Sequence, residues 1–371
     1  MLKPLDLKTD IRVVRGEGTL GQIGVLAKEL GFSRTLLVAD PGLARAGHLT
    51  HAHAFLDAAG IDALEFSDFG PNPDATMLEA GRDFADGKGV DSIIGLGGGS
   101  SLDCAKGINF LLTQGGRIHD FHGYGKATRA MLPMIGVPTT AGTGSEAQSY
   151  AIISDPTSHK KMACGDPKAA FRAVILDPQL TLTQPASVTA AAGYDAIAHA
   201  VETFVCTTRN PRSQELSREA WRLLDGNFER VLASPNDLAA RAAMQLGAFY
   251  AGTAIEHSML GATHACANPL TARYGTTHGD AIAILLSHVV RWNAESAGSL
   301  YAGLMDSTDA LAARLSSMAA VGRLPRTLRD IGVSRDDLAA LAQEAAEQWT
   351  GKFNPRPFDA AGAREVYACA F

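Results

Sequence analysis

The fold of this chain is decided by residues 92–106, whose sequence is SIIGLGGGSSLDCAK. The apolar beginning predicts a short buried strand, the glycines predict a tight turn, and the segment after them predicts a helix. A strand, a glycine turn and a helix in this order are typical of one βα unit in a mostly parallel sheet.

Further strands are predicted on both sides of this unit. Residues 35–39 and 63–66 precede it, and residues 132–137 follow it. Amphipathic helical stretches separate these apolar runs, as they do in βαβ units. Shorter β-like segments follow at residues 150–154 and 173–176. We therefore predict an α/β fold for this part of the chain.

The pattern changes after residue 182. Ala, Leu and Met then recur at helical spacing, as in residues 237–252 and 336–348, and strand signals almost vanish. We predict two domains, an α/β domain of residues 1–182 and an all-helical domain of residues 183–371. A cleft at the junction of two domains is the default place for a ligand site.

Charge and composition exclude several classes of partner. The 371 residues include 33 Lys and Arg against 39 Asp and Glu, a formal net charge of -6. Nucleic acids and anionic membrane surfaces attract clustered basic residues, so we expect neither as a partner. No stretch reaches the roughly 18 apolar residues of a membrane span.

The N-terminus and the cysteines indicate a location. Met1–Asp6 has no apolar run suited to a signal peptide, so we expect a soluble, cytoplasmic protein. The five cysteines are odd in number and contain no C-x-x-C pair. They predict reduced and mostly buried thiols rather than a disulfide framework or a zinc knuckle.

The glycine run suggests an anion site. Gly97, Gly98 and Gly99 have no Cβ, so the backbone can approach a ligand closely, and free N–H groups at a helix start favour an anion. A pyrophosphate is the anion we favour. The alternative is a plain βα turn with Ser100 or Ser101 as the helix cap. The run fits neither the G-x-G-x-x-G motif nor a P-loop.

A second loop, TTAGTGSE at residues 139–146, follows the strand predicted at 132–137. Its small hydroxyl side chains could bond to ribose or to the amide of a nicotinamide. The alternative is an ordinary helix cap at Thr143 or Ser145.

Four residues further along form a candidate metal site. Asp195 and His199 lie four apart in a helical stretch and therefore share one face. The pair alone is also compatible with an ion pair or a satisfied core histidine. His264 and His278 lie in Gly/Thr-rich segments, and three imidazoles with one carboxylate suit Fe(II) or Zn(II). Such a site can polarise an alcohol or carbonyl oxygen if one coordination position stays open.

Taken together, these motifs resemble the iron-containing (group III) alcohol dehydrogenase family. Each motif alone is weak or moderate, but their order and spacing together are highly specific. In chain order, the motifs that carry the resemblance are Pro71-Asn72-Pro73, the glycine run with Asp103 and Lys106, the segment 139–146, Gly193-x-Asp195-x-x-x-His199, and the pair His264 and His278.

The resemblance implies an N-terminal dinucleotide-binding domain, a helical domain that holds the metal, the cofactor between them, and a homodimer or larger homo-oligomer. This is the dehydroquinate synthase-like architecture. By the resemblance, NAD would contact Asp40, Asn72, Gly97, Gly98, Gly99, Ser100, Asp103, Thr139, Thr140, Thr143 and Lys161. A divalent metal, Fe²⁺ or alternatively Zn²⁺, would be bound by Asp195, His199, His264 and His278.

Two positions bear on specificity. Asp40 ends the first predicted strand, where the family places a residue near the adenosine ribose, and a carboxylate there favours NAD over NADP by repelling a 2′-phosphate. Alternatively, Asp40 merely starts the Asp-Pro-Gly turn.

Many family members carry a histidine four residues after the third metal ligand, where this chain has Asn268. Asparagine does not titrate near neutral pH, so a histidine proton relay is absent at that position.

The resulting hypothesis is hydride transfer between NAD(H) and a small alcohol or its aldehyde or ketone. One alternative is a lyase or cyclase of the dehydroquinate-synthase kind, whose charged substrate would need a Lys/Arg-rich pocket that the sequence near Asp195 and His264 does not show. Another is a metal-free reductase of the maleylacetate type, against which the four retained ligand positions argue. A non-catalytic NAD-binding protein is the third.

Overall fold

The computed structural model describes residues 11–158 and 160–371, so the N-terminal stretch considered for a signal peptide lies outside the described residues. The chain divides into two compact units. The first extends to residue 139 and also contains residues 145–153 and 162–177. The second contains residues 140–144, 154–161 and 178–371. The domain boundary that the sequence suggested near residue 182 stays a prediction.

The first unit is built on a six-stranded sheet whose neighbouring strands all run parallel. Strands β4 and β6 are buried at every residue, because helices cover both faces of such a sheet. The spatial order of the strands is β1 (Arg12–Arg15), β9 (Ala173–Leu176), β6 (Met134–Pro138), β4 (Ser92–Gly97), β2 (Arg34–Ala39) and β3 (Asp62–Phe66).

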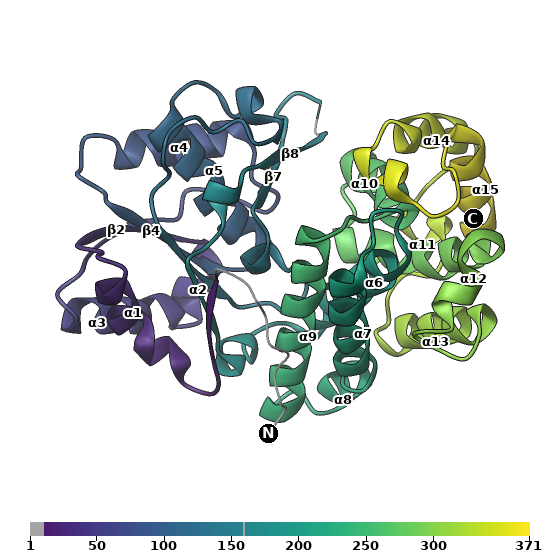
Figure 1. Ribbon diagram of the computed structural model, residues 1–371, viewed down its shortest axis with the longest axis horizontal. Helices are drawn as coiled ribbons and strands as arrows, with labels where there is room; N and C mark the ends of the chain where they lie inside the picture. Colours follow the sequence, from purple (N-terminus) through teal and green to yellow (C-terminus); the bar gives the residue numbers. More distant parts are fainter. Residues whose placement is uncertain (1–10, 159) are drawn as a thin grey trace. The chain divides into compact units, whose positions relative to one another are not determined.

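Helices lie on both sides of this sheet. Figure 1 shows α1 and α3 on one side of β2 and β4, and α4 and α5 on the other. A separate small sheet has the order β5 (Gly123–Tyr124), β8 (Lys161–Gly165) and β7 (Tyr150–Ser154). The helices of this unit are α1 (Ile23–Glu29), α2 (Pro41–Arg45), α3 (His48–Ala58), α4 (Ala75–Ala85) and α5 (Gly99–Gln114).

The second unit is helical, and α6 (Ala186–Val205) is its centre. Helix α6 is buried at every residue from Gly193 to Val205 and packs against α7, α9 and α11. A helix that is apolar on nearly all sides is expected in such a central place. The other helices are α7 (Pro211–Asp225), α8 (Phe228–Ala233), α9 (Leu238–Glu256), α10 (Ala262–Tyr274), α11 (His278–Trp292), α12 (Ala294–Tyr301), α13 (Thr308–Val321), α14 (Leu338–Ala346) and α15 (Ala360–Ala370).

The predicted fold class is confirmed: a parallel α/β unit is followed by a helical unit. The cysteine prediction also agrees with the structure, since all five thiols are free and only Cys369 is exposed. Within the described residues, no helix combines the length and the apolar character needed to cross a bilayer. The sequence pattern did not predict β1, β5 and β8: β1 begins and ends in exposed residues and β5 has only two residues, whereas β8 is mostly buried.

A fully buried lysine fastens the segment after β6 to helix α5. The Nζ of Lys106 donates to the carbonyl oxygen of Ser145 at 2.7 Å, to its hydroxyl at 2.9 Å and to the carbonyl oxygen of Tyr150 at 2.6 Å. The hydroxyl of Ser145 donates in turn to Asp103 at 2.5 Å. An ammonium has three donors, so its burial is offset by hydrogen bonds from all of them.

The neighbouring Glu146 carries a titratable group in the same buried region. Its exposed fraction is 2%. Burial raises the pKa of the Glu146 carboxyl to about 7, although a backbone hydrogen bond and the charge of Lys106 act in the opposite direction. The folded protein therefore holds this carboxyl protonated over a pH range in which the unfolded chain ionises it.

We predict that Glu146→Gln makes unfolding less dependent on pH. The carboxyl ordinarily titrates at 4.5, so stability from the buried protonated form is complete below that pH and is lost as pH rises through about 7. The free energy of unfolding of the variant relative to that of the wild type should therefore rise by up to about 3 kcal/mol between about pH 5 and about pH 8. Denaturant unfolding at the two pH values measures it, with Glu17→Gln at an exposed position as control. A pH-independent difference would contradict the prediction.

Candidate functional site

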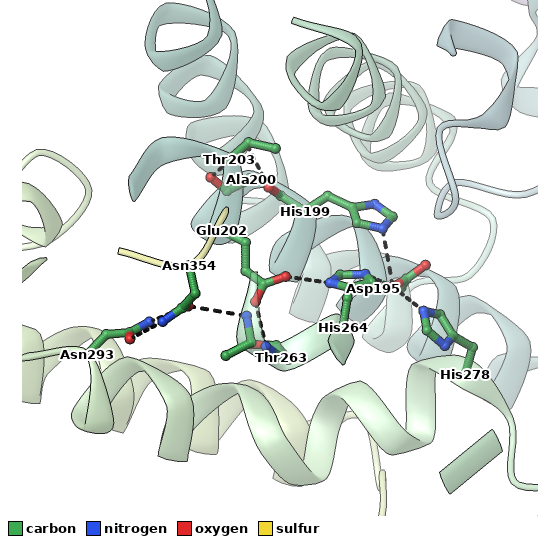
Figure 2. A network of polar contacts seen from close by, with 11 residues as sticks. Asp195, His199, Ala200, Glu202, Thr203, Thr263, His264, His278, Asn293 and Asn354 are labelled. Carbon is green, nitrogen blue, oxygen red and sulfur yellow. Dashed lines mark hydrogen bonds and ion pairs between the residues drawn. The ribbon is translucent and has the colours of Figure 1, made fainter. Parts of the chain in front are cut away.

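The four predicted metal ligands come from three helices and converge on one carboxylate oxygen. Asp195 and His199 belong to α6, His264 is the third residue of α10, and His278 is the first residue of α11. Asp195 Oδ1 lies 3.4 Å from His199 Nε2, 3.4 Å from His264 Nε2 and 3.7 Å from His278 Nε2. Figure 2 shows the three imidazoles directed at this carboxylate.

These residues fit a divalent cation. Ligand atoms about 2.1 Å from a tetrahedral ion lie about 3.4 Å from one another, which matches two of the observed separations. The ligand atoms of Asp195, His199 and His264 all lie within 4.8 Å of one another, whereas His278 lies outside this compact set. Asp195 Oδ1 and His264 Nε2 are buried and have no hydrogen-bond partner among the described residues. A cation between them would compensate both atoms.

The pKa values of three of the four side chains are shifted toward the charge states that metal ligands need. Burial alone would raise the pKa of Asp195, but the surrounding imidazoles hold it well below its usual value. Burial lowers the pKa of His199 to about 4 against the attraction of Asp195. Burial and the charge of Lys161 lower the pKa of His278 well below its usual value. At neutral pH the site therefore presents a carboxylate and two neutral imidazoles.

His264 differs from the other two histidines. Burial lowers its pKa, but Glu202 and Asp195 outweigh burial and raise the pKa to about 9. Without a cation, His264 therefore carries a proton between two carboxylates. A metal ion beside Nε2 takes the place of that proton, since a ligating histidine must be neutral.

Two glycines let neighbouring segments approach the ligand helix closely. A Cβ on Gly279 would lie 2.2 Å from the carbonyl oxygen of Ala191, and a Cβ on Gly142 would lie 2.7 Å from the Cβ of Ala192. Ala191 and Ala192 lie one turn before Asp195 on α6. Gly279 therefore allows the start of α11, and with it His278, to reach the site.

Glu202 is a site residue that the sequence reasoning missed. Its Oε2 lies 2.5 Å from His264 Nδ1, and its Oε1 accepts a hydrogen bond of 2.7 Å from the backbone N–H of Thr263. The signal was present in the sequence, because Asp195, His199 and Glu202 follow one another by four and three residues on one helix. Three polar residues on one face of an otherwise apolar helix indicate a shared function.

The first unit gathers several of the predicted cofactor residues at the carboxyl ends of its strands. Gly97 ends β4 with φ +145°, where a Cβ would lie 2.2 Å from Ser101 Oγ, so only glycine fits. The carbonyl oxygen of Gly97 accepts from the N–H of Thr139 at 2.9 Å, and Ser100 Oγ accepts from the N–H of Asn72 at 3.2 Å.

The remaining cofactor candidates divide between the two units. Gly98 caps α5 without a side-chain hydrogen bond, and Gly99 begins the helix, so its first N–H groups suit an anion. Asp103 bonds to Ser145, and Asp40 caps α2 by accepting from the N–H of Gly42 at 2.9 Å. The other candidates belong to the second unit, and they are Thr140, Thr143 and Lys161.

Comparisons with known proteins agree along most of the chain. Residues 11–178 match the family model "Iron-containing alcohol dehydrogenase", and residues 189–371 match "Fe-containing alcohol dehydrogenase family, C-terminal". Alcohol dehydrogenase 4 of Schizosaccharomyces pombe is 34% identical over 92% of this chain and 83% of that protein. The 1,3-propanediol dehydrogenase of Citrobacter freundii is 32% identical over 96% of each chain. The NAD-dependent methanol dehydrogenase of Bacillus methanolicus is 30% identical over 92% of this chain and 93% of that protein.

Solved structures lead to the same result. The structure of a 1,3-propanediol oxidoreductase superimposes with a TM-score of 0.94 at 30% identity and covers 97% of this chain and 98% of that chain. An alcohol dehydrogenase from Oenococcus oeni also gives a TM-score of 0.94, at 27% identity and the same coverage. The family predicted from the motifs is therefore confirmed. The chain belongs to the iron-containing alcohol dehydrogenase family and is an oxidoreductase that acts on CH–OH groups.

Proposed function

We propose that the protein transfers a hydride between NAD(H) and a small alcohol or its carbonyl partner, with a divalent metal held by Asp195, His199, His264 and His278. The observation that carries this proposal is the convergence of three imidazole nitrogens on one oxygen of Asp195. Iron is the metal we favour, and zinc is the alternative, since the same ligands suit both.

The metal would supply a Lewis acid for the oxygen of the alcohol or carbonyl, and the nicotinamide would accept or donate the hydride. The ligand residues contribute one negative charge, so they neutralise only half of a divalent ion. The carboxylate of Glu202 keeps His264 in place through Nδ1, which limits the reorganisation of this ligand during the reaction.

The burial of the ligands suggests where substrate enters. The side chains of Asp195, His199 and His264 are 5–6% exposed, whereas that of His278 is 23% exposed. We propose that substrate approaches beside His278. We propose small substrates because relatives are named for methanol, 1,3-propanediol and lactaldehyde.

On the cofactor side, we propose that the free N–H groups at the start of α5 hold the pyrophosphate. The unsubstituted edge of Gly97, Gly98 and Gly99 lets the phosphates lie against the backbone. Asn72, Ser100 and Thr139 adjoin this edge through hydrogen bonds. Asp103, Thr140, Thr143 and Lys161 complete the proposed set of contacts.

Proton transfer takes another route than a histidine relay. Asn268 lies one turn after His264 on α10 and donates to Gln348 Oε1 at 3.0 Å. Its amide neither gains nor loses a proton near neutral pH. Water or a ribose hydroxyl of the cofactor is the proposed proton carrier.

The dehydrogenase is favoured over the alternatives within the superfamily. Among the causes of the ligands' pKa shifts, Lys161 is the one cationic lysine or arginine, which is little for the charged substrate of a lyase or cyclase. The complete ligand set argues against a metal-free reductase. A cytoplasmic location and a homodimer stay part of the proposal, and the free cysteines fit a reducing compartment.

We predict that His278→Ala and removal of the metal both abolish turnover. Loss of one ligand should reduce kcat/KM by at least about 100-fold, because the ligand shell and the substrate-facing side are both disturbed. His288→Ala, ten residues further along the same helix, is the matched control and should retain activity. The assay follows NADH absorbance with defined Fe²⁺ or Zn²⁺ after chelation. Full turnover in verified metal-free protein would refute the proposed function.

We also predict that Asp40→Asn relaxes the preference for NADH over NADPH. Within the described chain only Oδ1 of Asp40 is engaged, by the N–H of Gly42. Asparagine is an equally good helix cap, so the fold should be retained while the charge that repels a 2′-phosphate is lost. The ratio of kcat/KM values for NADPH and NADH should rise about tenfold, the effect of roughly 1.4 kcal/mol between nearby charges.

Asp57→Asn controls for the change in net charge, because it makes the same substitution at an exposed position of α3. An unchanged cofactor ratio in Asp40→Asn would show that Asp40 serves only the turn.

A further inference from the structure

We infer that Glu202 is a positioning residue that aims His264 at the metal and fixes the start of helix α10 with the same carboxylate. The inference rests on the proposed metal site. It adds a residue from outside the ligand set and gives it two roles, orienting the imidazole of His264 and capping helix α10. Experiment can separate the two roles.

The first task concerns the imidazole. Glu202 Oε2 lies 2.5 Å from His264 Nδ1, and both side chains are 5% exposed. A carboxylate only accepts hydrogen bonds, so Nδ1 must carry the hydrogen. In the neutral ring that binds a metal, Nε2 is then left with its lone pair, and it is this nitrogen that lies 3.4 Å from Asp195 Oδ1. Glu202 thereby selects the tautomer and the ring orientation that a metal ligand requires.

The second task concerns the helix. Gly261 is the N-cap of α10 and has no side chain to accept from the first N–H groups. Glu202 Oε1 accepts from the N–H of Thr263 at 2.7 Å, and Asn354 Oδ1 accepts from the N–H of Ala262 at 3.2 Å. These two side chains replace the missing cap from other parts of the chain.

Glycine at position 261 is what lets both acceptors come so close. A Cβ there would lie 2.9 Å from Asn354 Oδ1 and 3.1 Å from Glu202 Oε1. Because His264 is only three residues further on, the cap determines where this ligand stands relative to Asp195. Glu202 itself is on α6 with Asp195, so it links the two ligand helices directly.

The same network continues to the third ligand helix. Asn354 and Asn293 exchange amide hydrogen bonds of 2.8 Å and 3.1 Å, and Asn293 caps the end of α11, which begins with His278. Figure 2 shows these residues together: Asn293 pairs with Asn354, Asn354 reaches the N–H of Ala262, and the next residue, Thr263, donates to Glu202, which also contacts His264. Glu202 is the member of the path that touches a ligand side chain.

The test separates orientation of the ligand from capping of the helix. In Glu202→Gln, one oxygen faces two N–H donors, so either His264 Nδ1 or the N–H of Thr263 loses its acceptor. We expect the dissociation constant for Zn²⁺, measured by competition with a chromogenic chelator, to rise about 10- to 100-fold. In the Co²⁺-loaded protein, the visible absorption bands should shift because they report the ligand geometry.

Asn354→Ala is the matched control. It removes the acceptor of the Ala262 N–H and the hydrogen bonds to Asn293 and Arg356, but no contact of His264. It should lower the melting temperature of the metal-free protein, but it should weaken Zn²⁺ binding and shift the Co²⁺ bands much less than Glu202→Gln does. Glu202→Asp provides a second variant if Glu202→Gln does not fold. Its shorter carboxylate should weaken Zn²⁺ binding, although less than the amide.

Two results would overturn the inference. The first is wild-type Zn²⁺ affinity in Glu202→Gln or, where that variant does not fold, in Glu202→Asp. The second is an equal loss in Asn354→Ala, which would reduce Glu202 to a helix cap. Zn²⁺ binding by the wild type and by His264→Ala is measured alongside. A wild type that binds no Zn²⁺, or a His264→Ala variant that binds it equally well, would instead overturn the proposed metal site.

Discussion

The second unit depends on the burial of one carboxylate, that of Asp195, inside a helix that is covered on all sides. An isolated charge in such a place costs several kcal/mol, so it requires compensation from its surroundings. Three imidazoles from three helices supply part of it, and their nitrogens approach a single oxygen. A divalent cation would supply the rest. The packing of α6, α10 and α11 and the proposed chemistry are therefore two results of one constraint.

The first unit is shaped by a different constraint: the backbone N–H groups at the start of α5 must stay accessible. Three consecutive glycines keep side chains away from these groups, and a buried lysine holds the neighbouring loop in place from behind. All three donors of the buried Lys106 ammonium in this unit are thus paired. The polar interior of the second unit includes Asp195 Oδ1 and His264 Nε2, which lack a hydrogen-bond partner among the described residues. The contrast distinguishes a structural buried charge from a candidate ligand site.

Sequence reasoning identified what periodicity and spacing encode. The apolar runs that became β2, β4 and β6 and the helical pattern of the second unit predicted the fold class, and the ordered motifs predicted the family. It missed β1, whose pairing with the distant β9 leaves no mark in its own pattern, and it also missed β5 and β8 of the small sheet. It also missed Glu202, whose importance comes from His264, 62 residues away in the chain.

The division of the chain into units has a consequence for how such proteins can be cut and recombined. The segments 140–144 and 154–161 belong with the helices, although they lie within the sequence of the α/β unit. A fragment that starts at residue 178 would therefore lack Gly142, which lies against the ligand helix, and Lys161, whose charge acts on His278. Chimeras between relatives would need to exchange all three segments together, so the two halves are not freely interchangeable modules despite their different architectures.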